Sequence, residues 1–396
     1  MATYSLKIYN GKVITPQGIL DRGTLLINRD KIDTVIAGDS NSTAAVEIDA
    51  KGNYISPGFI DIHVHGGGGH DFMDNTPEAF YGIANMHARH GTTAMCPTTL
   101  TSEVADLHQT LQVYDEVSVT KYAGACFIGM HIEGPYLSMN QRGAQDPRYI
   151  RDFDEKEYKS VVAKSRSIRR WSAAPERPGS SSFAKHMVAN NILPAIAHSD
   201  ANYEDVIQSI ADGYTHVTHF YSCMSGVTRR NAMRFAGIIE STYLLDELTT
   251  EIIVDGVHLP PPLLKLIYKV KGSGKVALIT DAMRAAGMGP GESILGSKKN
   301  GLHVIVEDGV AKLPDRSSFA GSVATTDMLV RNMITLAGVS LPEAVKMMAH
   351  TPAMIMNVAD RKGTLEKGKD ADVVIFDDNI DIRTTVVGGE IVYKAP

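Results

Sequence analysis

Apolar and polar residues alternate in short runs near the N-terminus of the chain. An alternation with a period of two is typical of strands that bury one face. The pattern therefore predicts an antiparallel β segment at this end of the chain. The runs occupy residues 5–9, 11–14, 24–27 and 33–37, with turn residues at 10–11 and 21–23.

Runs of the same kind occur near the C-terminus. Residues 371–376 form one run, and runs at 384–387 and 390–393 flank Gly388-Gly389, which is typical of a hairpin. Because neither end has enough strands to enclose a core, we expect the two ends to pair into one small β-sandwich domain. This predicted domain comprises residues 1–56 and 357–396.

Between the two ends, strand-like apolar runs alternate with helical stretches, as in βα units around a parallel sheet. Eight units that close on themselves make a TIM-type (β/α)8 barrel, and residues 57–356 are long enough for one. Spacing alone also allows an open doubly wound sheet, but no G-x-G-x-x-G motif opens the first βα turn. The eight runs are 59–65, 92–97, 126–133, 170–175, 193–198, 216–220, 251–254 and 275–280.

Two helices are expected after the eighth run. Gly321-Ser322 is predicted to open the first helix, which continues to about Leu336. The second is predicted from Ser340-Leu341-Pro342-Glu343, because this spacing of Ser and Glu matches a capping box.

Composition and charge narrow the range of partners. Lys plus Arg is 39 and Asp plus Glu is 45, which gives a net charge of −6, and no long run of like charge is present. Nucleic acid and anionic membrane are therefore poor partners. The apolar stretches are far shorter than the roughly 18 residues of a membrane span, and no secretory signal is visible. The three cysteines, an odd number without metal-type spacing, suit a reducing compartment, so we expect a soluble cytoplasmic protein.

Side chains that bind metals recur at the C-terminal ends of the predicted barrel strands, where such a barrel carries its active site. In a strand, residues i and i+2 point to one face, so His63 and His65 can chelate one ion together. One such pair would be unremarkable, but six ligand-type residues at five strand ends favour a metal site. The six are His63, His65, Glu133, His198, His219 and Asp281.

Imidazole and carboxylate ligands together suit Zn, Fe or Mn, whereas calcium prefers oxygen alone. An ion of this class lowers the pKa of a bound water from about 15.7 to near 7. A neighbouring carboxylate can then transfer the proton, and Asp281 is the candidate for this role. Two alternatives for Asp281 are a plain metal ligand and a helix N-cap.

Histidines elsewhere are expected to be structural or solvent-exposed in most cases. His216 is an odd offset from His219 and is therefore predicted on the opposite strand face. His131 shares a face with Glu133 and either supports the site or is structural. His258 follows the seventh strand and is a candidate substrate contact. The histidines placed in helices or loops are His87, His90, His108, His186 and His303.

The segments that carry these residues resemble the amidohydrolase superfamily. More narrowly, they resemble the N-acetylglucosamine-6-phosphate deacetylases, and Glu133-Gly134-Pro135 is the most specific motif. Residues 363–372 match the superfamily's return into its small β domain. The resembling barrel segments are 57–66, 129–136, 197–201, 218–221, 255–258 and 280–283.

The resemblance implies a ligand set of one or two divalent ions per chain. Many amidohydrolases bridge two metals with a modified lysine on the fourth strand, but residues 170–176 contain none, and Glu133 would take that place. Glu133, His198 and His219 would then hold the principal metal. His63 and His65 would complete a second site, as in those relatives that have one, and Asp281 would be the general base and then the acid.

The resemblance also implies contacts with a sugar phosphate. Relatives use an arginine after the sixth strand, in some members across a dimer, so we expect a homodimer and favour Arg229 over Arg230. Two departures occur where the substrate binds: many relatives have His where this chain has Gln145, and Asn-Ala where it has Ser222-Cys223. The residues expected to contact substrate are Gln145, Ser222, Cys223, Arg229 and His258.

The function implied is metal-dependent hydrolysis of the acetamide of N-acetyl-D-glucosamine 6-phosphate. Two alternatives keep the chemistry but change the substrate, to the galactosamine epimer or to an N-acyl amino acid. A third is a barrel that has lost catalysis, since fold does not fix function. The retention of Asp281 together with all the ligands argues against it.

Overall fold

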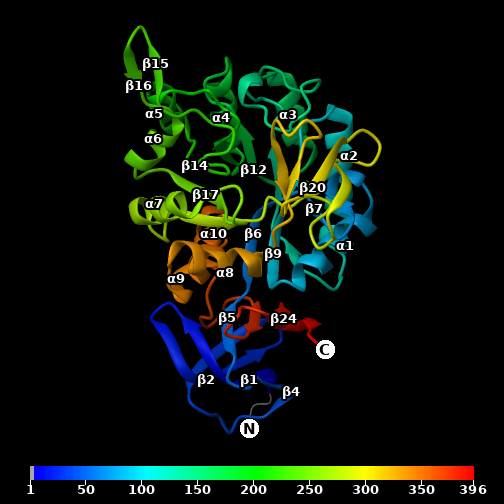
Figure 1. Ribbon diagram of the computed structural model, residues 1–396. Helices are drawn as coiled ribbons and strands as arrows, with labels where there is room; N and C mark the ends of the chain where they lie inside the picture. Colours follow the sequence, from blue (N-terminus) through cyan, green and yellow to red (C-terminus); the bar gives the residue numbers. More distant parts are fainter. Residues whose placement is uncertain (1–3) are drawn as a thin grey trace.

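The structure is a computed structural model that describes residues 4–396, and it places a barrel above a smaller sheet (Figure 1). The barrel strands run parallel in one sheet. Its edges meet where Asp281 N–H donates to the His63 carbonyl and His65 N–H donates to the Ala282 carbonyl, both at 2.9 Å. The predicted (β/α)8 fold class is confirmed. The strands are β6 (Phe59–Val64), β9 (Thr92–Thr99), β10 (Cys126–Phe127), β11 (Met130–Glu133), β12 (Ile168–Ala173), β13 (Leu193–Ile196), β14 (His216–Val217), β17 (Thr249–Ile253) and β18 (Val276–Ile279).

Helices surround these strands. The first begins after Thr76, whose side chain accepts the Ala79 N–H at 3.2 Å, and has Pro77 in its first turn, where no N–H is needed. Its inward face buries Phe80 and Ile83 against the barrel. The helices are α1 (Pro77–Ala88), α2 (Val104–Ser118), α3 (Glu155–Lys164), α4 (Ser180–Ala189), α5 (Tyr203–Asp212), α6 (Ile238–Leu244), α7 (Pro261–Lys271), α8 (Thr326–Ala337), α9 (Leu341–Met348) and α10 (His350–Ile355), with short 3-10 turns η1 (Phe72–Asp74) and η2 (Met139–Gln141).

Both ends of the chain join the smaller sheet, as expected. Strands from the N-terminal segment lie beside strands from the C-terminal segment, because β5 pairs antiparallel with β23. Apolar side chains from both ends, including Leu25, Ile55 and Val373, share one buried cluster. The strands are β1 (Tyr4–Thr15), β2 (Gly18–Asn28), β3 (Lys31–Ala37), β4 (Ala44–Asp49), β5 (Tyr54–Pro57), β23 (Val373–Phe376), β24 (Ile382–Val387) and β25 (Glu390–Lys394).

Both turns predicted in the N-terminal segment are wrong, although the residues around them do form strands. Residues 5–9 and 11–14 form one strand, β1, because Asn10 takes a left-handed conformation (φ 56°) at a bulge that does not end the strand. Residues 21–23 lie inside β2, and the chain turns instead at Pro16-Gln17. Polar residues within half-exposed strands were therefore interpreted wrongly as turns.

A four-stranded antiparallel insert follows the eighth barrel strand, and the sequence analysis did not predict it. It forms a sheet of its own and adjoins the segment after β18 through a parallel bridge between Ala282 and Ser322. Gly321-Ser322 ends its last strand, so the prediction that they open a helix was wrong, and α8 begins at Thr326. The predicted capping box at Ser340 is also wrong, because α9 begins there without a side-chain cap bond. The insert strands are β19 (Gly291–Leu295), β20 (Leu302–Glu307), β21 (Val310–Lys312) and β22 (Phe319–Ser322).

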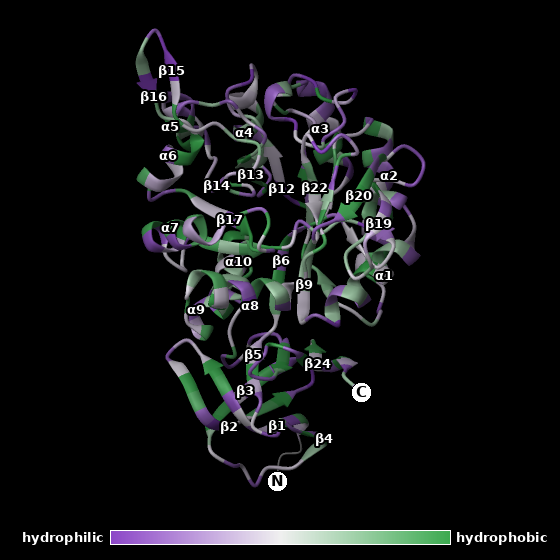
Figure 2. Cartoon of the chain, viewed as in Figure 1, coloured by the Kyte–Doolittle hydropathy of each residue, from purple (hydrophilic) through white to green (hydrophobic). Residues whose placement is uncertain are grey.

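Two further short pairs complete the strands. The pair β7 (Gly66–Gly67) and β8 (His70–Asp71) follows the first barrel strand, and the hairpin of β15 (Thr228–Arg230) and β16 (Met233–Phe235) follows the sixth. This second hairpin stands away from the barrel (Figure 1) and carries hydrophilic residues (Figure 2). Within residues 4–396, no helix is both long and apolar enough to cross a membrane.

Buried His87 on α1 holds the turn that follows His65. Its Nε2 donates to the Gly66 carbonyl at 2.9 Å, and burial lowers its pKa from 6.5 to about 4. Because the unfolded chain binds this proton at a higher pH than the folded chain does, His87 destabilises the fold as the pH falls from 6.5 toward 4.

We expect His87→Gln to remove this loss of stability in acid. The difference in free energy of unfolding, variant minus wild type, should therefore increase by about 2 kcal/mol when the pH is lowered from 6.5 to 5. The estimate uses about 1.4 kcal/mol per pH unit. Urea unfolding of both proteins at the two pH values measures the change. A difference that stays constant with pH would show that His87 does not remain neutral in the fold.

Candidate active site

Three of the six predicted ligands follow barrel strands directly and have left-handed backbone conformations. The φ angles of His198, His219 and Asp281 are 46°, 28° and 48°. Such angles are uncommon for residues other than glycine and concentrate at functional sites. At these three residues the backbone leaves the extended conformation of the strand. The three side chains all line the cavity at the mouth of the barrel.

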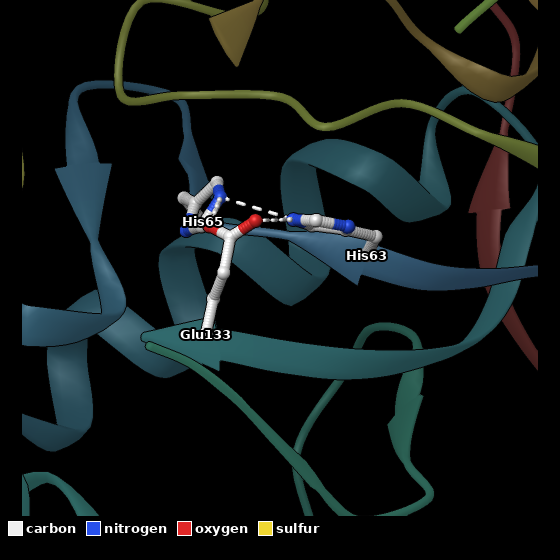
Figure 3. A group of neighbouring side chains, drawn as sticks. All are labelled: His63, His65 and Glu133. Carbon is white, nitrogen blue, oxygen red and sulfur yellow. Dashed lines mark hydrogen bonds and ion pairs between the residues drawn. The ribbon is translucent and has the colours of Figure 1, made fainter. Parts of the chain in front are cut away.

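His63 and His65 face Glu133 across the barrel mouth (Figure 3). Their Nε2 atoms lie 3.2 Å apart. Glu133 Oε1 is 3.7 Å from the Nε2 of His63, and Oε2 is 3.5 Å from the Nε2 of His65. Two side chains from β6 and the turn after it therefore meet one from the end of β11.

Glu133 also belongs to a second group, with His198 and His219. Its Oε1 is 3.0 Å from His219 Nε2 and 3.3 Å from His198 Nε2, and the two nitrogens are 3.2 Å apart. Asp281 Oδ1 completes the cluster at 3.1 Å from His65 Nε2. All six predicted residues therefore lie together: five of them form two possible metal-binding groups that share Glu133, and Asp281 lies beside these groups.

The Nε2 atoms of the histidines converge. In three of them Nδ1 faces an oxygen that only accepts, so Nδ1 carries a proton and Nε2 is the nitrogen available to a metal. Within each metal-binding group, the Nε2 atoms of the two histidines lie 3.2 Å apart, close enough to bind the same cation. The donor set of imidazole nitrogen and carboxylate oxygen fits a divalent transition metal. The acceptors are Glu251 Oε1 for His63 (2.9 Å), the Thr98 carbonyl for His65 (3.3 Å) and the Gln141 carbonyl for His198 (2.7 Å).

Glu251 and Arg170 form a fully buried ion pair beneath the six residues, and the sequence analysis missed it. Two guanidinium nitrogens donate to the carboxylate at 2.6 and 2.7 Å. Burial opposes ionisation of Glu251, but the charge of Arg170 outweighs it and holds the pKa of Glu251 well below its usual range. The carboxylate therefore fixes the ring of His63. A Glu inside an otherwise apolar run was the available indication.

His216 is a correction to the sequence analysis. It was predicted on the strand face opposite the ligands, but its Nε2 lies 3.1 Å from Glu251 Oε2 inside the barrel. The prediction failed because β14 ends at Val217, so strand alternation does not relate position 216 to His219. Burial lowers the pKa of His216 to about 4.

His131 supports the site without turning a nitrogen toward it. Its Nε2 lies 2.7 Å from Ser172 Oγ, and its Nδ1 lies 3.3 Å from Thr98 Oγ1. The ring packs edge-on against His63, with centroids 4.6 Å apart. Of the two interpretations left open for His131, the geometry favours support of the site.

The carboxylates give the cluster a strong preference for positive charge. Burial disfavours protonated His65, but its hydrogen bond to Asp281 and the charges of Asp281 and Glu133 outweigh burial and raise its pKa to about 9. Burial likewise opposes ionisation of Asp281, whose pKa is nevertheless lowered by the charges of His63 and His65. The site therefore attracts cations, whether protons or metal ions.

A cavity of about 520 Å³ opens above the cluster. This volume lies in the range of small-molecule sites. His63 does not line it and is fully buried.

No helix begins directly after Asp281 in the described chain, which removes the N-cap alternative for that residue. The insert adds Lys312, Arg316 and Phe319 to the cavity wall.

Four of the five predicted substrate contacts line this cavity. His258 is held by Asp255, with 2.7 Å between His258 Nδ1 and Asp255 Oδ2, and its ring lies 4.7 Å from that of Phe319. Gln145 is 4% exposed and bonds to Glu133. The four are Gln145, Ser222, Cys223 and His258.

Arg229, the fifth, does not line the cavity of its own chain. It is exposed on the β15–β16 hairpin, which stands away from the barrel (Figure 1). Arg230 is also exposed, and its guanidinium lies 5.5 Å above the ring of Phe235. A contact between Arg229 and the site of the same chain is therefore absent from the described structure.

Comparison with known proteins identifies the family. A sequence profile described as the amidohydrolase family matches residues 54–392, which include all six clustered residues and the cavity above them. This chain belongs to the amidohydrolase family. The amidohydrolase is accordingly a hydrolase that acts on an amide, and the family generally uses divalent metal ions.

Relatives over the full length are deacetylases of sugar phosphates. The amidohydrolase is 32% identical to an N-acetylglucosamine-6-phosphate deacetylase of Lysinibacillus sphaericus over 98% of this chain and 97% of that protein. It is 31% identical to an N-acetylgalactosamine-6-phosphate deacetylase of Escherichia coli O157:H7 over 96% and 97% of the two chains.

A solved structure shows the same architecture. The N-acetylglucosamine-6-phosphate deacetylase of Pasteurella multocida matches the amidohydrolase with a TM-score of 0.90 and 27% identity, over 98% of this chain and 100% of that one. The barrel and the small sheet thus recur together.

Proposed function

We propose that the protein hydrolyses the acetamide of N-acetyl-D-glucosamine 6-phosphate and releases acetate and D-glucosamine 6-phosphate. The observation that carries this proposal is the pair of metal-binding groups sharing Glu133 beside Asp281, at the mouth of an amidohydrolase barrel. The full-length similarity to deacetylases of this substrate supports the choice of substrate.

The residues present fit one or two divalent transition metals. Glu133, His198 and His219 would hold one ion, and His63 and His65 with Glu133 would hold a second. When bound, such an ion polarises a carbonyl and lowers the pKa of a water molecule. Glu251 and the Thr98 carbonyl orient His63 and His65 for this purpose.

Asp281 moves the proton in this proposal. Its side chain lines the cavity and its Oδ1 faces His65 and His63, so it can reach a water that attacks the acetamide carbonyl. Asp281 takes a proton from the water as the C–O bond forms. It then delivers that proton to the amide nitrogen, which must be protonated before the C–N bond breaks. Acetate and the free amine are the products.

The galactosamine epimer is the second candidate substrate. The similarity to an N-acetylgalactosamine-6-phosphate deacetylase, at 31% identity, favours it as the alternative. Ser222, Cys223 and His258 line the cavity and are proposed to contact the sugar.

An acetate-release assay on four compounds tests the substrate. They are the N-acetyl 6-phosphates of glucosamine and galactosamine, unphosphorylated N-acetylglucosamine, and an N-acetyl amino acid. We expect the highest kcat/KM on the glucosamine 6-phosphate. A higher value on the galactosamine compound would make the galactosamine epimer the preferred substrate. The highest value on the N-acetyl amino acid would overturn the sugar-phosphate proposal.

A phosphate contact from a second copy of the chain is part of the proposal. On the β15–β16 hairpin, Arg229 lies directly opposite Arg234, and like charges in that position destabilise a strand pair unless an anion compensates them. Val227 and Met233 beside them are 57% and 68% exposed, as expected of a surface that meets a partner. The proposed assembly is a homodimer.

Arg229→Ala is expected to raise the KM for the phosphorylated sugar and to leave the slow reaction of the unphosphorylated sugar unchanged. The reason is that only the phosphorylated compound uses the bidentate guanidinium. Steady-state kinetics on both sugars, with Arg230→Ala as the matched control, measures this. If Arg316→Ala shows the KM effect and Arg229→Ala does not, the phosphate binds to the insert of the same chain.

Cytoplasmic location is the remaining proposal. The three free cysteines support it, because thiols stay reduced in that compartment. Fractionation of the host cell, with the protein detected by antibody, tests it.

A further inference from the structure

The side chain of Gln145 is clamped between Thr101 and Glu133. Its Oε1 accepts hydrogen bonds from the Thr101 backbone N–H at 2.9 Å and from Thr101 Oγ1 at 3.0 Å. Its Nε2 donates to Glu133 Oε2 at 2.7 Å. Gln145 and Thr101 are both buried, at 4% and 6% exposure. Few other rotations of this amide are therefore open to it.

The backbone N–H of Thr101 and the charge of Glu133 also fix which end of the amide faces the carboxylate. If the amide were turned over, its NH2 would face the Thr101 N–H and its carbonyl would face the negative charge of Glu133. Both contacts are unfavourable. The NH2 of Gln145 therefore stays directed at Glu133 Oε2.

This clamp fixes the rotation of the Glu133 carboxylate relative to the histidines. With Oε2 held by Gln145, Glu133 Oε1 lies 3.0 Å from His219 Nε2, 3.3 Å from His198 Nε2 and 3.7 Å from His63 Nε2. Rotation of the carboxylate about its last bond, by less than the half-turn that exchanges its equivalent oxygens, would move the oxygen away from the three histidines and lengthen these distances. A fixed rotation saves the cost of ordering the ligand when a metal binds.

We propose that Gln145, backed by Thr101, is a positioning residue that orients Glu133 for metal binding, and that it does not serve mainly as a substrate contact. This assigns a different role to Gln145 from the one expected from the sequence, where it was placed among the substrate-binding residues. The inference rests on the metal site of the proposed function and not on the identity of the substrate.

The test measures zinc affinity of the metal-free full-length protein, by competition with a chelating dye and without substrate. Gln145→Met keeps the volume of the side chain but removes the donor, and it should weaken zinc binding by roughly 10- to 100-fold, as loss of such partners usually does. Gln145→Glu should weaken it at least as much, because two carboxylates then face each other. Thr101→Val should cause a smaller loss, since the backbone N–H still holds the amide.

Asn140→Ala is the control, because it removes an exposed amide from the same segment that bonds to Asp200. Unchanged zinc affinity in Gln145→Met, with a raised KM, would overturn the proposal and return Gln145 to the substrate. If Gln145→Glu does not fold, Gln145→Met and Thr101→Val still decide. A protein without deacetylase activity would contradict the proposed function, yet its zinc affinities would still test the role of Gln145.

Discussion

Replacement of Glu133 by Gln is expected to remove both metal and activity. Glu133 is the member common to the two metal-binding groups, and the neutral amide loses the charge that offsets the cation. An ion supplies several kcal/mol of transition-state stabilisation, and each 1.4 kcal/mol is a factor of ten in rate. We therefore expect kcat/KM to fall by at least about a thousandfold and the metal content to fall with it.

Elemental analysis together with the acetate-release assay measures both effects. Glu157→Gln is a matched control, because Glu157 bonds to Tyr136 and Arg151 away from the cavity. It should leave metal content and rate unchanged. Normal metal content and rate in Glu133→Gln would show that Glu133 is not a ligand.

Asp281→Asn is expected to separate proton transfer from metal binding. The variant keeps all the members of the two metal-binding groups, because Asp281 belongs to neither. Loss of a general acid and base typically costs roughly a hundredfold to ten-thousandfold. We expect kcat to fall within that range, while KM changes little and metal remains bound.

Kinetics at saturating substrate with parallel metal analysis makes this measurement. Near-normal turnover would leave Asp281 without a role in proton transfer. Loss of metal in proportion to activity would instead make Asp281 a plain ligand.

The sequence predicted the parts of the site that depend on the ends of strands. His63 and His65 share a strand face, and the ligands after β13, β14 and β18 follow apolar runs, so the ends of the predicted barrel strands indicated that they meet. The same reasoning failed at His216, because β14 has only two residues and its alternation does not reach His219. Short strands limit what a period of two can predict.

Reasoning from strand ends and periodicity could not predict contacts between side chains inside the barrel or insertions outside it. The Arg170–Glu251 pair joins β12 to β17, and nothing in the linear pattern shows that these two charges meet. The insert β19–β22 contains short polar strands that resemble a loop between the last barrel strand and a helix. Domain boundaries at 56/57 and 356/357 stay a prediction.

The central claim is metal-dependent deacetylation, and reconstitution tests it most directly. The wild-type protein is freed of metal with a chelator, verified by elemental analysis, and assayed for acetate release from N-acetyl-D-glucosamine 6-phosphate before and after addition of zinc, iron(II) or manganese. The account predicts no turnover in the metal-free protein and recovery with at least one of the ions. Full turnover in the verified metal-free protein would contradict it.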